Sequence, residues 1–366
     1  MRVAVVQEQI LAPVPGGTGR YTRELVAALA ATAPEGAQVT GWTGWYRDVG
    51  PAQVPGVAGP RRLPLPRRAL AEAWRRGIGP RPRGADVVHA PTLQVPPATR
   101  APLVVTVHDA VPWTHPETMT PRGVAWHRDM AGHAAARAAA IVVPTQAVAE
   151  EIVRYLPVDG RVTVIGEGVT DRLAVPVDAA RRARALGLPE DGRFLLSLAT
   201  LEPRKGLDVL LAALATAGAP EVPLLLVGQP GWGGIDPERT AERLGLPAGR
   251  VRVLGRLSDA DLATVLDRST ALVAPSRAEG FGLPVLEAMA AGVPVVSSAA
   301  AALVEVGGGA TVTTPVGDAA ALAEALARVV EDAGLRAELS AAGRTRAASF
   351  SWAGAARRTW ELYGSL

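Results

Sequence analysis

Lys205 is the only lysine among the 38 lysine and arginine residues of this 366-residue chain. It lies in the segment Leu201 to Gly206 (LEPRKG), directly after an apolar run that predicts a buried strand. A lysine that persists in so arginine-rich a composition indicates a position where a compact ammonium is needed and a planar guanidinium will not serve. An ammonium at a strand-to-helix turn suits the binding of a phosphate. A surface lysine without function is the alternative.

A second segment, Glu279 to Gly292 (EGFGLPVLEAMAAG), combines glycines, a proline and two acids. Pro284 is expected as the first residue of a helix and Gly292 as the glycine that ends it. The glycines let backbone N–H groups approach a ligand, and the start of the helix attracts an anion. Glu279 and Glu287 are placed to accept hydrogen bonds from neutral hydroxyls. A nucleotide sugar offers both a diphosphate and hydroxyls, whereas the alternative is a helix capped by Glu279 with Glu287 in solvent.

The histidines and one pair of acids give weaker signals. His108 ends an apolar run and precedes Asp109, which favours a role in a site. His89 also ends an expected strand, where a residue that lines the cleft and a buried, hydrogen-bonded histidine are equally expected. The other three histidines show no metal-ligand spacing. Asp259 to Asp261 (DAD) has the D-x-D spacing of some metal sites, but Ser258 predicts a helix N-terminus there, so no catalytic metal is predicted.

The elements that must position these residues alternate between short β-branched runs and longer amphipathic stretches, which predicts parallel sheets flanked by helices. The expected strands of the first half are Val3–Val6, Gln38–Trp42, Val87–His89, Val104–His108, Ile141–Pro144 and Val162–Ile165. Those of the second half are Phe194–Leu198, Pro223–Val227, Arg252–Leu254, Ala271–Ala274, Pro294–Ser297 and Ala310–Thr313. Expected helices include Arg20–Ala33, Arg122–Ala139 and Leu207–Ala217.

The predicted fold class is therefore α/β, with two Rossmann-like, doubly wound domains. The first is expected over residues 1–170 and the second over 171–349, with a linker near residues 168–190. No sequence repeat relates the two halves. Because ligands of such sheets bind at the carboxyl ends of the strands, the chemistry is expected in a cleft between the domains.

Composition sets broad limits on function. Without cysteine the chain has no disulfide, thiolate metal site or cysteine nucleophile, which fits a reducing cytoplasm. Met1 to Glu8 does not resemble a signal peptide, and no apolar stretch reaches the roughly 18 residues of a spanning helix. We expect a soluble cytoplasmic protein, or one that lies peripherally on the inner face of the membrane.

Basic residues concentrate between Arg61 and Arg83, where eight arginines face one acid, Glu72. One interpretation is a patch that docks on anionic lipid or on a phosphorylated acceptor. The other is a short amphipathic helix, from about Arg67 to Arg76, that packs Leu70 and Trp74 inward. Nucleic acid is not an expected partner, since neither an aromatic platform nor a helix-turn-helix pattern accompanies the arginines.

The segment Glu279 to Gly292 resembles the E-x7-E motif of retaining glycosyltransferases of family 4, which have the GT-B architecture of two Rossmann-like domains facing a cleft. Other matches occur in the order that this family requires, and together they span essentially the whole chain. They are Gly16 to Tyr21 (GGTGRY), Val107 to Asp109 (VHD), Leu201 to Gly206 (LEPRKG), and Phe350 to Trp352 (FSW) before a final helix, within residues 350–366, that in such proteins crosses back to the first domain.

The resemblance implies a role for each matching residue. Arg204 and Lys205 would neutralise the departing diphosphate, Glu279 would hold donor-sugar hydroxyls, and His108 would contact the sugar near its reacting carbon. Further donor contacts would come from Gly17, Gly255, Arg256, Leu257, Phe281, Gly282, Leu283 and Glu287, with Glu287 on the ribose and residues 255–257 beside the base. The acceptor side would contain Gly16, Gly19, Tyr21, Asp109 and Trp113.

The chain departs from the family in three places. Ala199-Thr200 stands where many relatives carry an arginine, so Arg204 must supply the second positive charge. Gly166-Glu167-Gly168-Val169 stands where relatives have an asparagine before Gly-Val. Ser298 to Ala302 is alanine-rich where relatives often have a glycine-rich turn.

The resemblance is closest to bacterial mannosyltransferases and implies transfer of a hexose with retained configuration, without cofactor or metal. GDP-mannose is the favoured donor, UDP- and dTDP-sugars are alternatives, and the acceptor would be a glycan, a lipid-linked glycan or a small molecule. A nicotinamide dehydrogenase is disfavoured because Gly17-x-Gly19 lacks the third glycine of the dinucleotide turn. A sugar-nucleotide epimerase of the same architecture and a non-catalytic carbohydrate-binding protein are the remaining alternatives.

Overall fold

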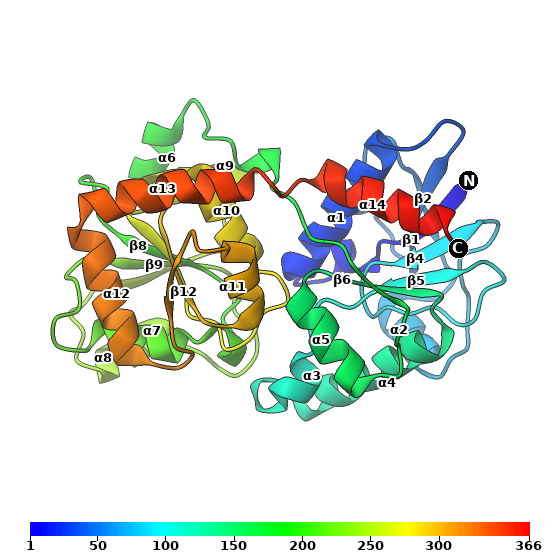
Figure 1. Ribbon diagram of the computed structural model, residues 1–366, viewed down its shortest axis with the longest axis horizontal. Helices are drawn as coiled ribbons and strands as arrows, with labels where there is room; N and C mark the ends of the chain where they lie inside the picture. The colour runs from blue at the N-terminus through cyan, green and yellow to red at the C-terminus, as the bar shows by residue number, and fades with distance from the viewer. The chain divides into compact units, whose positions relative to one another are not determined.

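Figure 1 shows a computed structural model of the chain, which describes residues 1–366. The chain divides into two compact units. Unit 1 consists of Met1–Pro116, Thr120–Gly168 and Phe350–Leu366, and unit 2 consists of Val169–Ser349 with Glu117–Met119. Each unit is built around one parallel sheet flanked by helices, so the predicted fold class of two doubly wound α/β domains is confirmed.

The sheet of unit 1 has seven strands in the order β3-β2-β1-β4-β5-β6-β7, and all neighbours are parallel. They are β1 (Arg2–Val6), β2 (Gln38–Thr43), β3 (Ala58–Arg62), β4 (Val87–Ala90), β5 (Leu103–Thr106), β6 (Ala140–Val143) and β7 (Val162–Val164). Six follow the predicted β-branched runs. Sequence reasoning missed β3, because its residues AGPRR have low strand propensity; it lies at the sheet edge, where proline is tolerated.

Six helices and short 3₁₀ turns complete unit 1. The helices are α1 (Gly16–Ala31), α2 (Arg67–Arg75), α3 (Val111–Thr114), α4 (Pro121–Arg137), α5 (Gln146–Tyr155) and α14 (Trp352–Gly364), and the turns are η1 (Glu8–Leu11) and η2 (Gly50–Ala52). A further turn, η3 (Pro116–Thr118), includes residues assigned to unit 2. One face of the sheet forms a continuous apolar core with α2, α4 and α5. Leu70 and Trp74 of α2 are fully buried in it, so the amphipathic-helix interpretation of this segment is confirmed.

The C-terminal helix α14 belongs to unit 1 and lies beside α1, as Figure 1 shows. Trp360 Nε1 donates a hydrogen bond to the carbonyl oxygen of Leu29 in α1, at 3.1 Å. Tyr363 is buried, and its hydroxyl lies 2.5 Å from Nδ1 of His89 at the end of β4. The predicted return of the final helix to the first domain is therefore confirmed, and the expected buried, hydrogen-bonded state of His89 holds.

The sheet of unit 2 has six parallel strands in the order β10-β9-β8-β11-β12-β13. They are β8 (Leu195–Leu198), β9 (Leu224–Val227), β10 (Val251–Gly255), β11 (Ala271–Ala274), β12 (Val295–Ser298) and β13 (Val312–Thr314). All six follow the runs that predicted them. Strands β8 and β11 are neighbours at the point where the strand order reverses, and this is where parallel sheets place their ligands.

The helices of unit 2 cover both faces of its sheet. They are α6 (Ala179–Ala185), α7 (Leu207–Leu214), α8 (Pro237–Arg243), α9 (Asp259–Arg268), α10 (Leu283–Ala291), α11 (Ala301–Gly307), α12 (Ala319–Glu331) and α13 (Ala333–Ala347), with 3₁₀ turns η4 (Asp171–Leu173) and η5 (Pro203–Lys205). Leu207, Leu210, Leu211 and Leu214 of α7 are buried on one face of the sheet with α8 and α12, as their spacing predicted.

The segment expected as a linker, residues 168–190, is partly folded. Arg182 of α6 pairs with Asp178 at 2.7 Å and with Asp261 of α9 at 2.7 Å. These contacts hold α6 on unit 2, so the charged composition that indicated a linker reflects ion pairs on a helix. Ser258 accepts a hydrogen bond from the backbone N–H of Asp261, which confirms that the DAD segment is a helix N-terminus.

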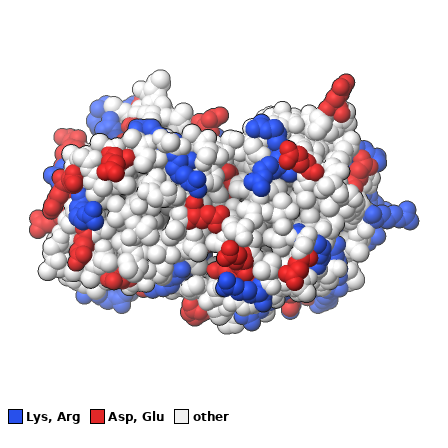
Figure 2. All heavy atoms as spheres, viewed as in Figure 1, with Lys and Arg blue, Asp and Glu red and all other residues white.

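Charged side chains of both signs are interspersed over the face of the molecule that Figure 2 shows. This distribution agrees with the small formal net charge of +3.

Candidate functional site

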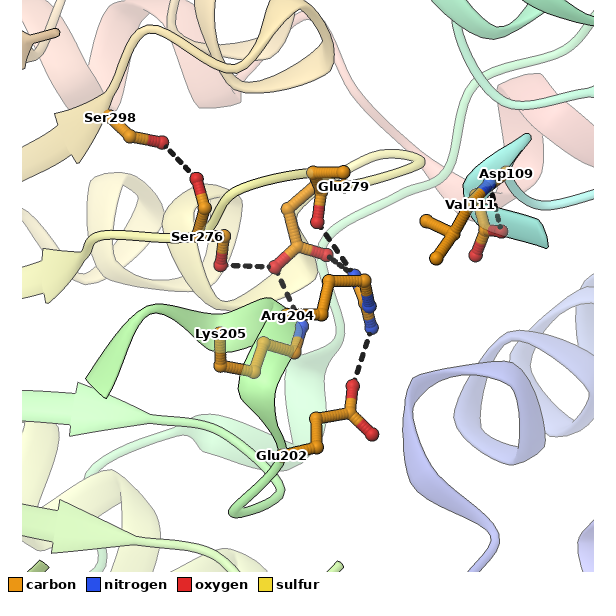
Figure 3. A network of polar contacts seen from close by, with 9 residues as sticks. Asp109, Val111, Glu202, Arg204, Lys205, Ser276, Glu279 and Ser298 are labelled. Carbon is orange, nitrogen blue, oxygen red and sulfur yellow. Dashed lines mark hydrogen bonds and ion pairs between the residues drawn. The ribbon is translucent and has the colours of Figure 1, made fainter. Parts of the chain in front are cut away.

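Two loops at the carboxyl end of the second sheet meet in a network of ion pairs, shown in Figure 3. One loop follows β8 and contains η5, and the other follows β11, the neighbouring strand. Lys205 Nζ donates to Glu279 Oε1 at 2.6 Å, and Arg204 donates to Glu279 Oε2 at 2.8 Å. The three side chains are between 12% and 18% exposed, so solvent screens these contacts only partly.

Two residues that sequence reasoning did not single out extend the network. Arg204 donates from its other nitrogen to Glu202 at 2.8 Å, and Ser276 Oγ donates to Glu279 Oε1 at 2.6 Å. Glu202 lies within the LEPRKG segment, so its spacing of two residues from Arg204 was the available signal. Ser276 carried no comparable signal. With two cations and two carboxylates, the formal charges of Glu202, Arg204, Lys205 and Glu279 balance.

The ionisation of Glu279 reflects this arrangement. Burial is the largest single influence on its pKa and raises it, because a low-dielectric environment disfavours the charged carboxylate. The charges of Lys205 and Arg204, together with hydrogen bonds from Lys205 and Ser276, outweigh burial and lower the pKa to about 2. Glu279 is therefore a carboxylate at neutral pH. Both its oxygens are engaged by cations, so a donor hydroxyl that binds it must share or displace one of these contacts.

Backbone conformation brings the two loops together. Gly206, which follows Lys205, has a φ of +64°, and a Cβ added there would lie 2.1 Å from the carbonyl oxygen of Pro275 in the other loop. Only glycine allows this approach. Arg277 strengthens the contact, because its guanidinium forms two hydrogen bonds with the carboxylate of Asp208, at 2.6 and 2.8 Å. The network is thus held by the backbone and by a second ion pair as well as by its own charges.

Helix α10 begins close to this network, four residues after Glu279. Its first residue is Leu283, so Pro284 is the second residue and not the first as expected; the N-cap is Gly282, with a φ of +100°. No side chain caps the helix, so Glu279 is not its cap. A helix start without a side-chain cap presents its amide dipoles to an anion. Gly292 ends the helix in the left-handed conformation, as predicted.

The remaining donor-side residues of unit 2 lie at or near the same end of its sheet. Glu287 is within α10 and only 4% exposed, which contradicts the alternative of a solvated glutamate. Phe281 and Leu283 are also buried, so their backbone rather than their side chains is available to a ligand. Gly255 is the last residue of β10, followed by the exposed Arg256 and the half-buried Leu257.

In unit 1, His108 lies two residues beyond the end of β5, so the expected strand Val104–His108 ends earlier than predicted. Its Nε2 is 2.9 Å from the carbonyl oxygen of Pro91, which can only accept, so Nε2 carries a hydrogen. Nδ1 faces Glu167 Oε1 at 3.9 Å. Burial lowers the pKa of His108, against the opposing effects of the Pro91 hydrogen bond and the charge of Asp109. A hydrogen bond from this imidazole to a donor sugar would have to replace one of these two contacts.

Tyr21, which the resemblance assigned to the acceptor side, is buried. It is 2% exposed, its hydroxyl lies 3.3 Å from Thr106 Oγ1, and its ring packs edge-on against His108 with centroids 4.6 Å apart. Burial raises the pKa of Tyr21 well above the ordinary value of a tyrosine. Tyr21 therefore packs against His108 in the interior of unit 1, because the apolar side of α1 faces the core.

The glycine-rich segment is also placed differently from the expected loop. Gly16 is the first residue of α1, and Gly17 and Gly19 lie in its first two turns. Gly19 is packed closely, since a Cβ there would meet Pro15 at 2.5 Å, whereas Gly16 and Gly17 have open space around them. Gly19 therefore serves packing, and Gly16 and Gly17 leave the helix start accessible.

Asp109 and Trp113, the other acceptor-side residues, surround the start of α3. Asp109 Oδ1 accepts from the backbone N–H of Val111 at 3.1 Å, as Figure 3 shows. Trp113 is half-buried and stacks on Tyr155, the last residue of α5. Tyr155 was missed from the sequence because stacking joins residues far apart in the chain.

No group of three or more histidine, aspartate or glutamate side chains lies close enough to hold a metal ion. No helix combines the length and the apolar character that crossing a membrane requires.

Two family models match the chain in succession. Residues 15–172 match "Glycosyltransferase Family 4", and residues 178–346 match "Glycosyl transferases group 1". Among curated proteins, the serotype-specific mannosyltransferase WbdA of Escherichia coli is 31% identical over 244 residues, 63% of this chain and 29% of that protein. A D-inositol 3-phosphate glycosyltransferase of Nocardioides sp. is 35% identical over 241 residues, 61% of this chain and 53% of that protein. The chain thus spans roughly a third to a half of these relatives' length.

Solved structures share the fold over the full chain. Sucrose-phosphate synthase from Thermosynechococcus elongatus superposes with a TM-score of 0.76 at 24% identity, covering 100% of this chain and 98% of that one. HepE from Anabaena, in complex with UDP and glucose, gives a TM-score of 0.76 at 20% identity and covers 100% of both chains. Since glycosyltransferase models match both halves in order and the fold is the same two-sheet architecture, the chain belongs to the family 4-like glycosyltransferases of GT-B type.

Proposed function

We propose that this chain transfers a hexose from a nucleoside diphosphate sugar to a hydroxyl group of an acceptor. The observation that carries the proposal is the contact of Lys205 and Arg204 with Glu279, four residues before the uncapped start of α10. Cations and helix amides suit a diphosphate, and the carboxylates of Glu279 and Glu287 suit hydroxyls. The complex of HepE with UDP and glucose supports such a donor for a protein of this fold.

In this proposal the balanced charges of the unliganded network change when the donor binds. The diphosphate competes with Glu279 for Lys205 and Arg204, and the carboxylate of Glu279 then accepts hydrogen bonds from the sugar. When the bond between the anomeric carbon and the phosphate oxygen breaks, negative charge develops on the diphosphate. Two preorganised cations lower the energy of that transition state.

We propose retention of the anomeric configuration, as the resemblance implies. The acceptor hydroxyl attacks from the face that the phosphate leaves, the new bond joins the anomeric carbon to the acceptor oxygen, and the departing phosphate oxygen takes the acceptor's proton. NMR of the product made from an α-linked donor is expected to show an α-linked glycoside. A β-linked product would contradict this proposal, although not glycosyl transfer itself.

GDP-mannose is the donor we favour, because the motifs resemble those of mannosyltransferases and WbdA carries that name. The test is thermal unfolding with GDP, UDP or NADH present. GDP at 100 times its dissociation constant is expected to stabilise the protein by about 2.7 kcal/mol. Greater stabilisation by UDP than by GDP would assign a UDP-sugar donor, and stabilisation by NADH alone would favour the dehydrogenase alternative. If no nucleotide stabilised the protein, a non-catalytic carbohydrate-binding protein would be the remaining alternative.

We also propose that transfer needs no metal, since the two cations of the network take the place that a metal would have on the diphosphate. Activity that is unchanged after treatment with EDTA supports this, and activity restored only by Mg²⁺ or Mn²⁺ would contradict it.

For location we propose a cytoplasmic protein with electrostatic attachment to anionic membrane through the arginines between Arg61 and Arg83.

A further inference from the structure

An aromatic pair in unit 1 joins two helices at the protein surface. The rings of Trp113, in α3, and Tyr155, at the end of α5, are stacked with centroids 5.7 Å apart and an angle of 14° between their planes. Trp113 is partly buried against the core, whereas Tyr155 is 43% exposed. Tryptophan and tyrosine offer rigid, amphipathic contact area at a small cost in conformational entropy, which makes them frequent in binding sites.

Two carboxylates accompany this pair, each four residues earlier in the chain. Asp109 precedes Trp113, and Glu151 precedes Tyr155 within α5, where a spacing of four residues places side chains on one face. The carboxylates of Asp109 and Glu151 interact with each other, and burial followed by the charge of Asp109 raises the pKa of Glu151. His115 and Arg154 oppose this effect. The stacked rings thus join two segments that also carry the two carboxylates.

Packing alone does not account for the acids. The stacked rings satisfy the apolar contact between α3 and α5, yet two like charges close to each other destabilise the protein. Glu151 is half-buried, and no side chain or backbone group of the protein hydrogen-bonds its carboxylate. Only one oxygen of Asp109 has a partner, the backbone N–H of Val111. Hydroxyl donors from a ligand would satisfy the remaining oxygens and relieve the repulsion.

We propose that Asp109, Trp113, Glu151 and Tyr155 bind an uncharged sugar ring of the acceptor. The apolar C–H face of the ring stacks on the aromatic pair, and its hydroxyls donate to the two carboxylates. The same carboxylates repel phosphate, so a phosphorylated ring is rejected at this position. The identification of this sugar as the acceptor rests on the proposed function. Neither the motifs nor the family resemblance assigned a role to Glu151 or Tyr155.

The test measures binding of a neutral probe, α-linked mannotriose, and of mannose 6-phosphate by saturation-transfer NMR and calorimetry. The variants are Tyr155→Ala and Glu151→Gln, both at exposed or half-buried positions, and the matched control is Val153→Ala, which is 40% exposed on the same helix. We expect each of the first two changes to weaken mannotriose binding at least fivefold, and Val153→Ala to change it less than twofold. Mannose 6-phosphate is expected to bind at least tenfold more weakly than mannotriose to the native chain.

Several results would overturn the inference: no binding of mannotriose by the native chain, equal binding by native chain and both variants, or tighter binding of mannose 6-phosphate. GDP and UDP are titrated into the same samples, and their binding is expected to be unchanged by all three substitutions. If the native chain bound neither GDP nor UDP, only the donor proposal would be refuted, because the measurement of glycan binding does not depend on nucleotide binding.

Discussion

Lys205 lies where a single ammonium can act on a diphosphate, but it does not act alone. Glu279 binds it at 2.6 Å and Arg204 binds the other oxygen of the same carboxylate. The carboxylate fixes both cations in place before a ligand arrives, which is the kind of preorganisation that makes electrostatic stabilisation effective. Glu202 accepts a hydrogen bond from the other terminal nitrogen of Arg204 and so also fixes the orientation of that guanidinium.

Replacing Lys205 by alanine is expected to lower kcat at least a hundredfold, because one of the two cations that offset the charge of the departing diphosphate is lost. Lys205→Arg keeps the positive charge but carries it on a planar guanidinium. Its kcat is therefore expected to lie between the values of the native chain and of Lys205→Ala. Steady-state kinetics with the donor identified by nucleotide binding provide the measurement, and circular dichroism checks that the fold is intact. A well-folded Lys205→Ala variant with unchanged turnover would remove the diphosphate role.

The depressed pKa of Glu279, about 2 against an ordinary value of 4.5, makes its contribution to stability depend on pH. A carboxyl with a lowered pKa in the folded state stabilises the fold above its unfolded pKa, and this contribution is lost as pH falls through the folded pKa. Between pH 6 and pH 3 the native chain is expected to lose about 2 kcal/mol of unfolding free energy through this group. Urea unfolding of the native chain and of Glu279→Gln gives the comparison, and parallel pH profiles for both would contradict the ion-pair account.

At the scale of elements, the approach of the loops after β8 and β11 depends on Gly206. Alanine at Gly206 combines a positive φ of 64° with a contact of 2.1 Å to the Pro275 carbonyl oxygen. Gly218 is the matched control, because its φ of +84° is equally unfavourable for alanine but nothing lies within 4 Å. Gly218→Ala is expected to cost about 1–2 kcal/mol, and Gly206→Ala roughly 1–3 kcal/mol more. Thermal unfolding of both variants decides the matter, and equal losses would show that the loop contact is not tight.

The sequence predicted most of these elements for a clear reason. Central strands such as β9 and β11 are buried on both faces, so they appear as uninterrupted runs of Leu, Val and Ala. The edge strand β3 is not buried on both faces and so needs no apolar run. Its Pro60 and its arginines are not typical of a strand, so the sequence did not predict it. The start of α1 was placed too late because Gly16 and Gly17 have low helix propensity, although packing of the following turns on the core determines that the helix forms.

The candidate site was predictable where its residues share a segment and not where contacts join distant ones. Arg204, Lys205 and Glu279 were identified from their motifs, but their pairing with one another followed only from the adjacency of β8 and β11. The burial of Tyr21 and the engagement of both His108 nitrogens likewise arise from tertiary contacts with Thr106, Pro91 and Glu167. Spacing along a chain indicates which residues have chemistry available and says little about which partners already occupy them.

At the scale of the whole molecule, a net charge of +3 conceals an uneven distribution of arginines. Between residues 61 and 83 five exposed arginines have no acidic partner, and we call them the arginine surface: Arg61, Arg62, Arg68, Arg81 and Arg83. Arg75 and Arg76 differ, since they pair with Glu72 and Asp129. Leu70 and Trp74 are fully buried beneath them, so this helix has no apolar side chain left to insert into a bilayer.

Attachment to membranes through the arginine surface is therefore expected to be purely electrostatic. The native chain is expected to sediment with vesicles of 30% phosphatidylserine and 70% phosphatidylcholine at 50 mM salt, and to be released at 500 mM salt, where charges more than a few ångströms apart are screened. Changing all five arginines to glutamine should abolish sedimentation, whereas Arg75→Gln with Arg76→Gln should not, because neighbouring acids already neutralise those two. Binding that survives 500 mM salt would indicate an apolar anchor such as Ile78, which is 60% exposed, and would contradict purely electrostatic attachment. Absence of binding at 50 mM salt would show that these arginines do not attach the protein to anionic lipid.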